Sequence, residues 1–213
     1  MPSVLTGKKK MCYTEYELKA QRNDSARKEE RSMNITLYGA ASERIDPIYM
    51  TRVEELGKAL AEGGHSLVFG AGSTGLMGAA ARGFAAGNGK IIGVTPHFMH
   101  ELEPICDFCT ELIQTETMAD RKDIMEAKAD AFVIVPGGIG TFDEFFQILT
   151  LKALGRHSKP IILYNISGFW DGMLSVIGAD LFKGFISKEV ATGFDICETP
   201  ESVFRVLARE SRA

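Results

Sequence analysis

The chain has 213 residues, of which 45% are hydrophobic and 24% charged, the balance of a soluble globular protein with one domain. Its formal net charge of -4 excludes a general attraction to nucleic acid or to an anionic membrane, and we expect neither as a partner. No apolar run approaches the roughly 20 residues of a membrane span, and four scattered cysteines do not form a secreted disulfide framework, so we expect a cytoplasmic protein with free thiols.

The N-terminal segment differs in composition from the rest. Residues 1–32 are rich in lysine, arginine and glutamate and carry few large apolar side chains after Leu18. Such a segment cannot bury enough surface to fold alone, and it lacks the apolar core of a signal peptide. We predict a flexible tail or loosely docked helix over residues 1–32, followed by one domain over residues 33–213.

From there short apolar runs alternate with helical patterns. The runs predict strands at residues 35–38, 66–69, 90–94, 131–135 and 160–164. Asp46 as N-cap and Pro47 as first residue predict a helix that Gly63 and Gly64 end, and small residues predict another at about 75–87. Continuous β-branched runs between helices indicate parallel strands buried on both faces. We therefore predict a doubly wound, Rossmann-like α/β sheet.

A glycine loop follows the second strand. Gly70, Gly72 and Gly75 match the G-x-G-x-x-G spacing of dinucleotide-binding loops. A dinucleotide site also needs an acidic residue about 20 positions further on, which binds the ribose hydroxyls. Residues 88–98 contain none. We predict that the loop instead packs a helix against the sheet and borders a ligand pocket.

Two histidines and two cysteines follow in the next loop. His97, His100, Cys106 and Cys109 supply four ligands of the kinds that structural zinc sites use. The alternative is that the cysteines are small buried residues and the histidines ordinary loop residues. We favour the alternative and predict no metal.

A second glycine loop, PGGIGT at residues 136–141, lies between the strand at 131–135 and a helix. Glycines let a ligand approach the backbone, and the first amides of the helix point outward with the positive end of the helix dipole. This arrangement predicts a phosphate site. The alternative is a tight turn in which Thr141 is the N-cap and Glu144 completes a capping box.

The stretch PGGIGTFDE at residues 136–144 resembles the PGG-x-GT-x-x-E signature of the LOG family, whose members are cytokinin-activating or related nucleotide phosphoribohydrolases. Further segments agree in collinear order over about residues 33–210. They are VFGAGSTGLMG at 68–78, Arg121, Lys122 and Met125 in an RK-x-x-M element, and an LG-x-H-x-KP segment that begins the stretch 154–174. Ala71, Leu151 and the GAAS loop at 39–42 depart from the family pattern, which bears on base specificity.

The resemblance implies that Glu144 and Arg121 are the catalytic residues. The implied reaction is hydrolysis of the N-glycosidic bond of a nucleoside 5′-monophosphate, AMP or an N6-modified cytokinin riboside monophosphate, to free base and ribose 5-phosphate. A carboxylate beside C1′ stabilises an oxocarbenium-like transition state and activates water. Arginine stays protonated, so Arg121 holds Glu144 ionised or clamps substrate oxygens. The resemblance further implies a homodimer and no cofactor.

The same resemblance assigns a larger set to substrate binding: Gly72, Gly75, Glu103, Lys122, Gly137, Gly138, Ile139, Gly140, Thr141, Phe142, Asp143 and Thr150. The group that protonates the leaving base stays open between Asp120 and Glu103. His65 and His157 stand alone and are expected to be structural. The rival function is a non-catalytic nucleotide or cofactor carrier, which needs the glycine loop but has no use for a carboxylate beside C1′. No lysine with pyridoxal phosphate partners is recognisable.

Overall fold

The computed structural model describes residues 32–210. In chain order the elements are β1 (Asn34–Tyr38), α2 (Pro47–Glu62), β2 (Ser66–Phe69), α3 (Gly75–Ala86), β3 (Ile91–Pro96), the 3-10 helix η1 (His97–Glu101), β4 (Glu111–Thr115), α4 (Met118–Lys128), β5 (Ala131–Ile134), α5 (Ile139–Ala153), β6 (Ile161–Tyr164), η2 (Ile166–Gly168), α6 (Asp171–Lys183), α7 (Lys188–Ala191), β7 (Asp195–Cys197) and α8 (Pro200–Glu210). The predicted tail lies outside these residues, apart from Ser32, and remains a prediction.

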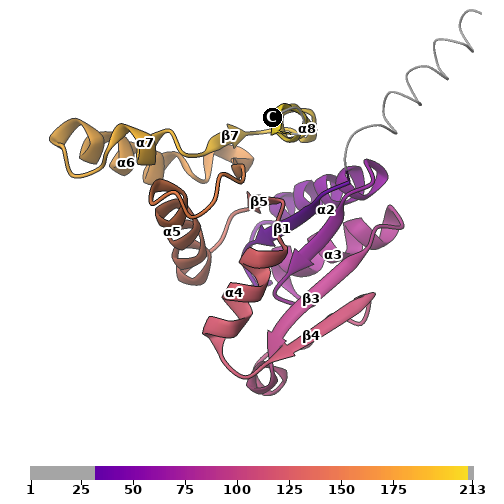
Figure 1. Ribbon diagram of the computed structural model, residues 1–213. Coiled ribbons are helices and arrows are strands. Elements are labelled where there is room, and N and C mark those ends of the chain that lie inside the picture. The colour runs from indigo at the N-terminus through magenta and orange to yellow at the C-terminus, as the bar shows by residue number, and fades with distance from the viewer. Residues whose placement is uncertain (1–31, 211–213) are drawn as a thin grey trace, which may run out of the picture. The chain divides into compact units, whose positions relative to one another are not determined.

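All seven strands form one parallel sheet in the order β4-β3-β2-β1-β5-β6-β7 (Figure 1). The chain first winds from β1 outward to β4 and then returns to place β5 on the other side of β1. Thr36 of β1 therefore pairs with Val68 of β2 on one side and Phe132 of β5 on the other. The gap between the carboxyl ends of β1 and β5 is the topological switch point, where open α/β sheets bind ligands.

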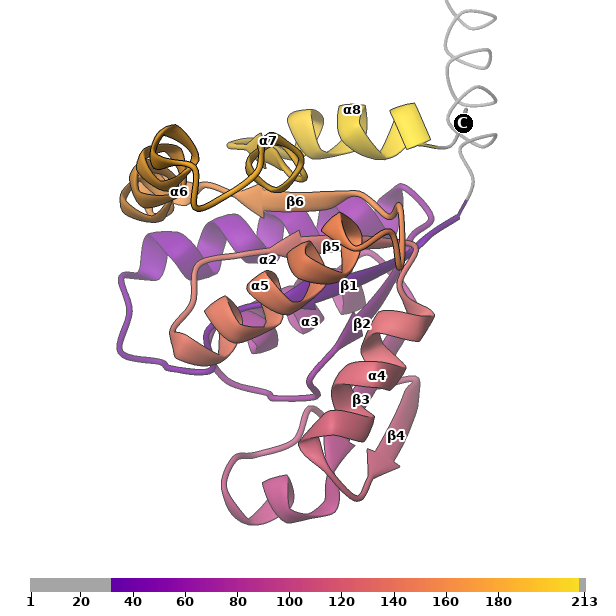
Figure 2. The same ribbon diagram turned by 60° about the vertical axis from the view of Figure 1, so that its left-hand side comes forward.

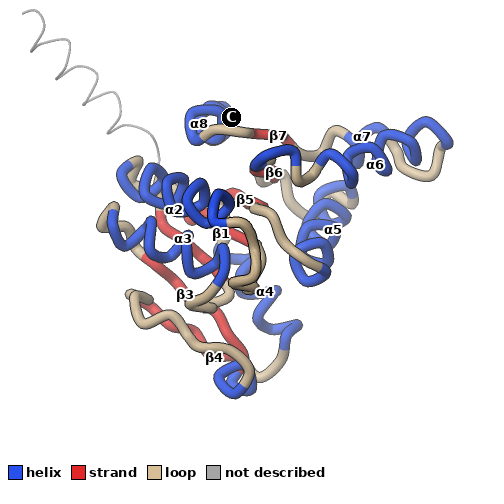
Figure 3. The backbone as a smooth tube through the Cα atoms, turned by 180° about the vertical axis from the view of Figure 1, so that it is seen from behind, coloured by secondary structure: helices blue, strands red, loops and turns tan. Residues whose placement is uncertain are grey.

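Helices cover both faces of the sheet, as the buried β-branched runs predicted. One core packs α2, α3 and α8 against the sheet, and the other packs α4, α5 and α6 against the opposite face. Figure 2 shows α4 and α5 in front of the strands, and Figure 3, seen from behind, shows α2 and α3 on the other side. The predicted doubly wound fold is confirmed.

The helix ends follow the predicted chemistry where the cap is local. Asp46 accepts a hydrogen bond from the Ile48 N–H at the start of α2, and Gly63 is the C-cap. The five predicted strands are present within one or two residues of their expected bounds. None of the described helices is both long and apolar enough to cross a membrane.

The strands that the sequence did not reveal are the two edges, β4 and β7. β4 alternates exposed and less exposed side chains along ELIQT, and β7 has only three residues. An edge strand is hydrogen-bonded on one side only and needs no continuous apolar run, so its sequence resembles that of a loop.

Candidate active site

Two loops meet at the switch point. The loop after β1 begins at Gly39, and the loop after β5 begins at Val135 and Pro136. The Ala40 N–H donates to the Pro136 carbonyl oxygen at 3.1 Å, and a Cβ on Gly39 would overlap the side chain of Val135. This close approach fixes the PGG loop against the carboxyl end of β1.

The PGG loop presents an uncapped helix start. α5 begins at Ile139, with Gly138 as an extended N-cap and no side-chain cap. The amides of Ile139, Gly140 and Thr141 precede any possible i−4 partner within the helix. Gly138 and Gly140 are exposed, and an added Cβ on either would meet nothing within 4 Å. Donors and open space therefore coincide at the positive end of the helix.

The alternative capping box at Thr141 is wrong. Thr141 is the third residue of α5, only 4% exposed, and a Cβ on Gly137 would overlap its hydroxyl. Glu144 is a full turn inside the helix and faces Arg121. The capping box that does exist opens α4, where Thr117 and Asp120 exchange side-chain and backbone hydrogen bonds.

At the other glycine loop the amides that begin the helix are already hydrogen-bonded. At the beginning of α3 the N–H groups of Leu76 and Met77 both point at the Ala40 carbonyl oxygen, at 2.8 and 3.4 Å. The Thr74 hydroxyl donates to the Ala41 carbonyl at 2.9 Å. Gly75 has φ +57, and a Cβ there would overlap Ala40. These contacts agree with the predicted packing role and leave a pyrophosphate few donors.

Arg121 and Glu144 face each other across α4 and α5. The Arg121 Nη1 lies 3.6 Å from the Glu144 Oε1, and these side chains are 9% and 11% exposed. The Arg121 Nε also donates to the Val94 carbonyl at 3.2 Å. A Cβ on Gly70 would overlap the guanidinium, so the glycine loop makes room for it. The guanidinium is thereby held at the carboxyl ends of β2 and β3.

Burial dominates the electrostatics of this pair. Removal of Glu144 from water raises its pKa from 4.5 to about 7, although the Arg121 charge opposes the shift. The Arg121 charge favours the ionised form of Glu144, as expected, but desolvation outweighs this attraction. Whether Arg121 acts through Glu144 or by clamping substrate oxygens stays a prediction. A carboxyl with this pKa exchanges a proton near neutral pH, which is what a general base or acid requires.

Glu103 supplies a second carboxyl to the same region. Its carboxyl oxygen would lie 3.6 Å from a Cβ on Gly72, and it feels the charge of Arg121. Partial burial raises the pKa of Glu103. Asp120, the other candidate proton donor, is committed to the α4 capping box with Thr117.

Several predicted binding residues have other partners. Lys122 binds Asp143 and also donates to the Gln147 side chain at 3.1 Å, which ties α4 to α5. Phe142 packs edge-on against the buried Trp170, with ring centroids 5.4 Å apart. Thr150 is exposed in the last turn of α5, at the end away from the PGG loop. Of these residues, Lys122 and Asp143 lie close enough to Glu144 to shift its pKa, whereas Thr150 is at the other end of the helix.

A hollow of about 290 Å³ opens beside the PGG loop. It is lined by Ala40, Ser42, Ile45, Tyr49, Leu76, Pro136, Gly137, Gly138 and Phe169. Tyr49 and Phe169 were not predicted, and they meet edge-on with ring centroids 6.2 Å apart. The only signal for Phe169 was its place in the family-like stretch 154–174. Tyr38, also unpredicted, is buried at the end of β1 beside the Glu144 charge.

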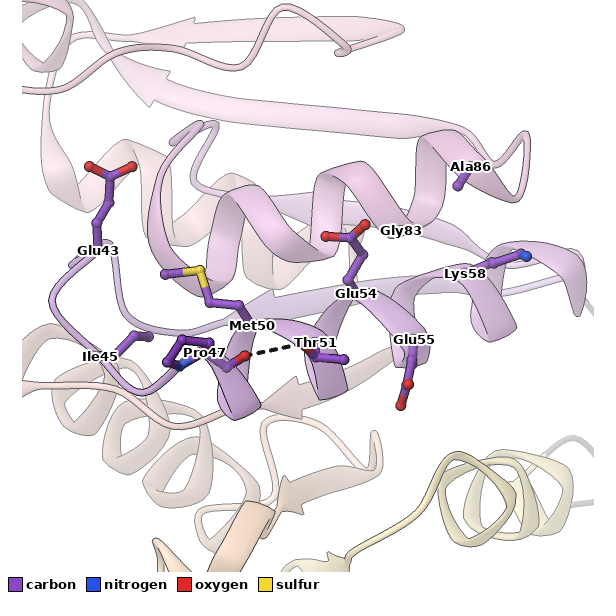
Figure 4. A pocket seen from close by; sticks show the side chains of 10 residues that line it. All are labelled: Glu43, Ile45, Pro47, Met50, Thr51, Glu54, Glu55, Lys58, Gly83 and Ala86. Carbon is purple, nitrogen blue, oxygen red and sulfur yellow. Dashed lines mark hydrogen bonds between the residues drawn. The ribbon is translucent and has the colours of Figure 1, made fainter.

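A larger hollow, about 470 Å³, lies elsewhere, along α2 and the end of α3 (Figure 4). Its walls include Met50, Glu54 and Lys58, and none of the predicted site residues. Glu54 is paired with Arg82 at 3.1 Å. The larger hollow thus contains none of the features that define the candidate site, which are the free amides and the buried acid–arginine pair.

The four potential zinc ligands are not gathered. The His97 Nε2 lies 3.7 Å from Glu116, and the His100 Nε2 lies 3.2 Å from the Gln114 amide. Cys106 and Cys109 contact each other instead. No group of three or more histidine, cysteine or acidic residues suited to a metal occurs within residues 32–210. The prediction of a metal-free protein stays a prediction.

The fold and the candidate site define a Rossmann-like α/β protein with a glycine loop and an uncapped helix start at the switch point. The family model described as "Possible lysine decarboxylase" matches residues 77–207, and the chain belongs to this family, the LOG family. It is 36% identical over 159 residues to the Oryza sativa cytokinin riboside 5′-monophosphate phosphoribohydrolase LOG, covering 75% of this chain and 66% of that one. The Mycobacterium tuberculosis cytokinin riboside 5′-monophosphate phosphoribohydrolase is 35% identical over 177 residues, covering 82% of this chain and 92% of that one.

Solved structures share the architecture at lower identity. The molybdenum cofactor carrier protein of Chlamydomonas reinhardtii superposes with a TM-score of 0.65 at 23% identity, covering 84% of this chain and 98% of that one. The molybdenum cofactor binding protein of Rippkaea orientalis gives 0.65 at 22% identity, covering 84% and 98%. At this identity the likeness bears on the fold alone.

Proposed function

We propose that this chain hydrolyses the N-glycosidic bond of a nucleoside 5′-monophosphate, releasing the base and ribose 5-phosphate. The observation that carries the proposal is Glu144, a buried carboxyl with a pKa of about 7 that faces Arg121. It lies on the helix whose free amides suit a phosphate. The proposal draws its substrate class, AMP or an N6-modified relative, from the names of the rice and mycobacterial proteins.

The phosphate is assigned to the start of α5. Ile139, Gly140 and Thr141 offer backbone donors there, and each charge-assisted hydrogen bond contributes about 1.5–3 kcal/mol. At the start of α3, by contrast, Leu76 and Met77 already bind Ala40. A single anionic group at α5 is the pattern that a monophosphate matches.

Glu144 is assigned the role of base and charge stabiliser at C1′. Its distance of 3.6 Å from Arg121 exceeds hydrogen-bond length, so its oxygens remain available to a water molecule or to ribose. In the ionised state it both accepts a proton from the attacking water and stabilises the oxocarbenium-like charge. Arg121, anchored on Val94, orients that carboxylate.

Glu103 is assigned the proton that the leaving base takes up. Its raised pKa favours the protonated form more than for an ordinary glutamate, and Arg121 lies close to both carboxyls. Asp120 is excluded from this role by its engagement at the α4 N-cap.

A homodimer is part of the proposal. Large apolar side chains stand exposed on α5 and at the end of α6: Ile139 is 86% exposed, Phe182 94% and Phe185 82%. Exposed aromatic and aliphatic groups of this size mark association surfaces. A second copy packed over α5 would also explain why Thr150, far from Glu144 in one chain, belongs to the predicted set.

The test is direct. The protein is incubated with AMP, and the products are separated by chromatography. Adenine and ribose 5-phosphate in equal amounts are expected from the wild type, with almost none from Glu144→Gln. AMP that binds but is recovered unchanged would favour the rival carrier function, whose support is the fold shared with the cofactor carrier proteins.

A further inference from the structure

The proposed hydrolysis makes no use of a pair of neighbouring cysteines. Cys106 and Cys109 lie between η1 and β4, and the Cys109 thiol hydrogen-bonds to Cys106. Cys106 is 4% exposed, whereas Cys109 is half-buried. Cys197, the other cysteine within residues 32–210, is buried on β7 beside Ser202, and burial raises its pKa. Of these three cysteines only Cys106 and Cys109 have a partner thiol, and small reagents approach the pair from the partly exposed Cys109.

The pair is coupled by hydrogen bonds to the active site. Cys106 ends a segment, residues 103–106, that we term the strap, and Glu103 begins it. The Cys106 N–H donates to the Ala71 carbonyl at 2.8 Å, and the Ser73 N–H donates to the Pro104 carbonyl at 3.0 Å. Residues Gly72 and Ile105 form an antiparallel bridge. The position of the Glu103 carboxyl therefore depends on where Cys106 is held.

We propose that Cys106 and Cys109 are an oxidisable dithiol, and that their disulfide draws the strap away from the glycine loop and displaces Glu103. The effect on hydrolysis rests on the proposed function. The formation of the disulfide and the movement of the strap do not.

The oxidant that the proposal requires is a peroxide. The hydrogen bond from Cys109 lowers the pKa of Cys106 to about 7, which supplies thiolate at neutral pH. The Cys106 sulfur attacks one peroxide oxygen, the O–O bond breaks, and hydroxide leaves and is protonated to water. The Cys109 sulfur then attacks the Cys106 sulfenic acid and expels a second water. Two thiols and one hydrogen peroxide thus give one disulfide and two waters.

The geometry indicates which side moves. A disulfide S–S bond is about 2.05 Å, shorter than any hydrogen bond between thiols by roughly 1.5 Å. Cys109 is braced on β3, where a Cβ on Gly93 would come within 2.8 Å of its sulfur. Its neighbour Thr110 exchanges two hydrogen bonds with Ile91, at 3.0 and 2.9 Å. Cys106 itself makes one backbone hydrogen bond outside its own loop, to Ala71, so we expect Cys106 to move rather than Cys109.

The experiment uses the full chain, reduced with dithiothreitol, desalted and treated with hydrogen peroxide. Peptide mapping without reductant is expected to find Cys106 joined to Cys109, with a mass loss of two hydrogens that dithiothreitol reverses. Amide exchange of the strap should quicken at least about tenfold in the oxidised form, because the Cys106 N–H loses its acceptor. AMP hydrolysis should fall at least about tenfold, since displacements near 1 Å cost that much.

Two variants serve as matched controls. Cys12→Ser combined with Cys197→Ala keeps the pair and should respond as the wild type does, whereas Cys109→Ser should show neither the link nor the change in exchange. The proposal is overturned if excess peroxide leaves the pair unlinked, or if the linked protein keeps the exchange and hydrolysis of the reduced one. If the reduced protein does not hydrolyse AMP, the proposed function fails, while mapping and exchange still decide this inference.

Discussion

Two glycine loops of the described chain each end a strand and begin a helix, yet only one leaves its helix amides free for a ligand. The loop at Gly70–Gly75 reads more like a nucleotide fingerprint, but its helix amides bind Ala40 and its space holds Arg121. The loop at Pro136–Gly140 has free amides and open space above Gly138 and Gly140. The difference shows that a glycine motif offers donors to an anion only where the neighbouring chain leaves its amides free.

The largest expected effect tests whether hydrolysis takes place beside the loop at Pro136–Gly140. Glu144→Gln keeps size and removes the charge, so kcat should fall by roughly 10² to 10⁴, the range for positioned acid–base groups. AMP should still bind, as measured by calorimetry. Asp123→Asn, an exposed charge change on α4, is the control and should retain wild-type turnover. Near-normal turnover in Glu144→Gln would mean that Glu144 is not a catalytic residue.

The next effect concerns the 5′-phosphate. If the α5 amides bind it, the binding energy also positions C1′ against Glu144. We expect kcat/KM for AMP to exceed that for adenosine by at least about 10²-fold, or about 2.7 kcal/mol. Di- and triphosphates should be poorer substrates, because the amides at the start of α5 serve a single anionic group. Equal values for nucleoside and monophosphate would contradict a phosphate site at the PGG loop.

A single amide can be removed from the second loop without harm to the helix. Ile139 is the first residue of α5 and follows the extended Gly138, a position and a predecessor that proline accepts. Ile139→Pro should therefore fold normally and lose one phosphate donor. We expect its kcat/KM for AMP to be about 10- to 100-fold below that of Ile139→Ala, which loses the same side chain. Equal values for the two variants would exclude this amide as a donor.

Substitutions in the two loops should also differ in their effect on the unfolding free energy. Gly75→Ala places a side chain at φ +57 against Ala40, so we expect a loss of at least about 2 kcal/mol in unfolding free energy. Gly140→Ala meets nothing within 4 Å inside a helix and should be neutral or gain up to about 1 kcal/mol. Urea denaturation measures both. A reversed order would mean that the second loop, not the first, serves the fold.

The smallest effect is the pH dependence of Glu144. With a pKa of about 7 for the base, kcat/KM should rise about tenfold between pH 6 and pH 8. Burial favours the protonated carboxyl in the fold. As pH rises from 4.5 to about 7, the wild type should therefore lose unfolding free energy relative to Glu144→Gln. If kcat/KM fell between pH 6 and pH 8, Glu144 would act as an acid and not as a base.

Sequence by itself determined the central sheet, because parallel strands buried on both faces require continuous apolar runs and helices between them. It also determined the α2 caps, since Asp46 and Gly63 act on adjacent backbone. The family-like motifs pointed to Glu144 and Arg121 before their pairing was visible.

Tertiary structure alone decided which residues become a site. Edge strands β4 and β7 lack the apolar runs that identify a strand. The capping box predicted at Thr141 failed because the N-cap of α5 is Gly138, three residues earlier. The raised pKa of Glu144, the blocked donors beside Ala40 and the contact between Cys106 and Cys109 all arise between segments distant in sequence. Desolvation and competition for hydrogen bonds depend on which distant segments pack against a residue, and the local sequence does not determine those segments.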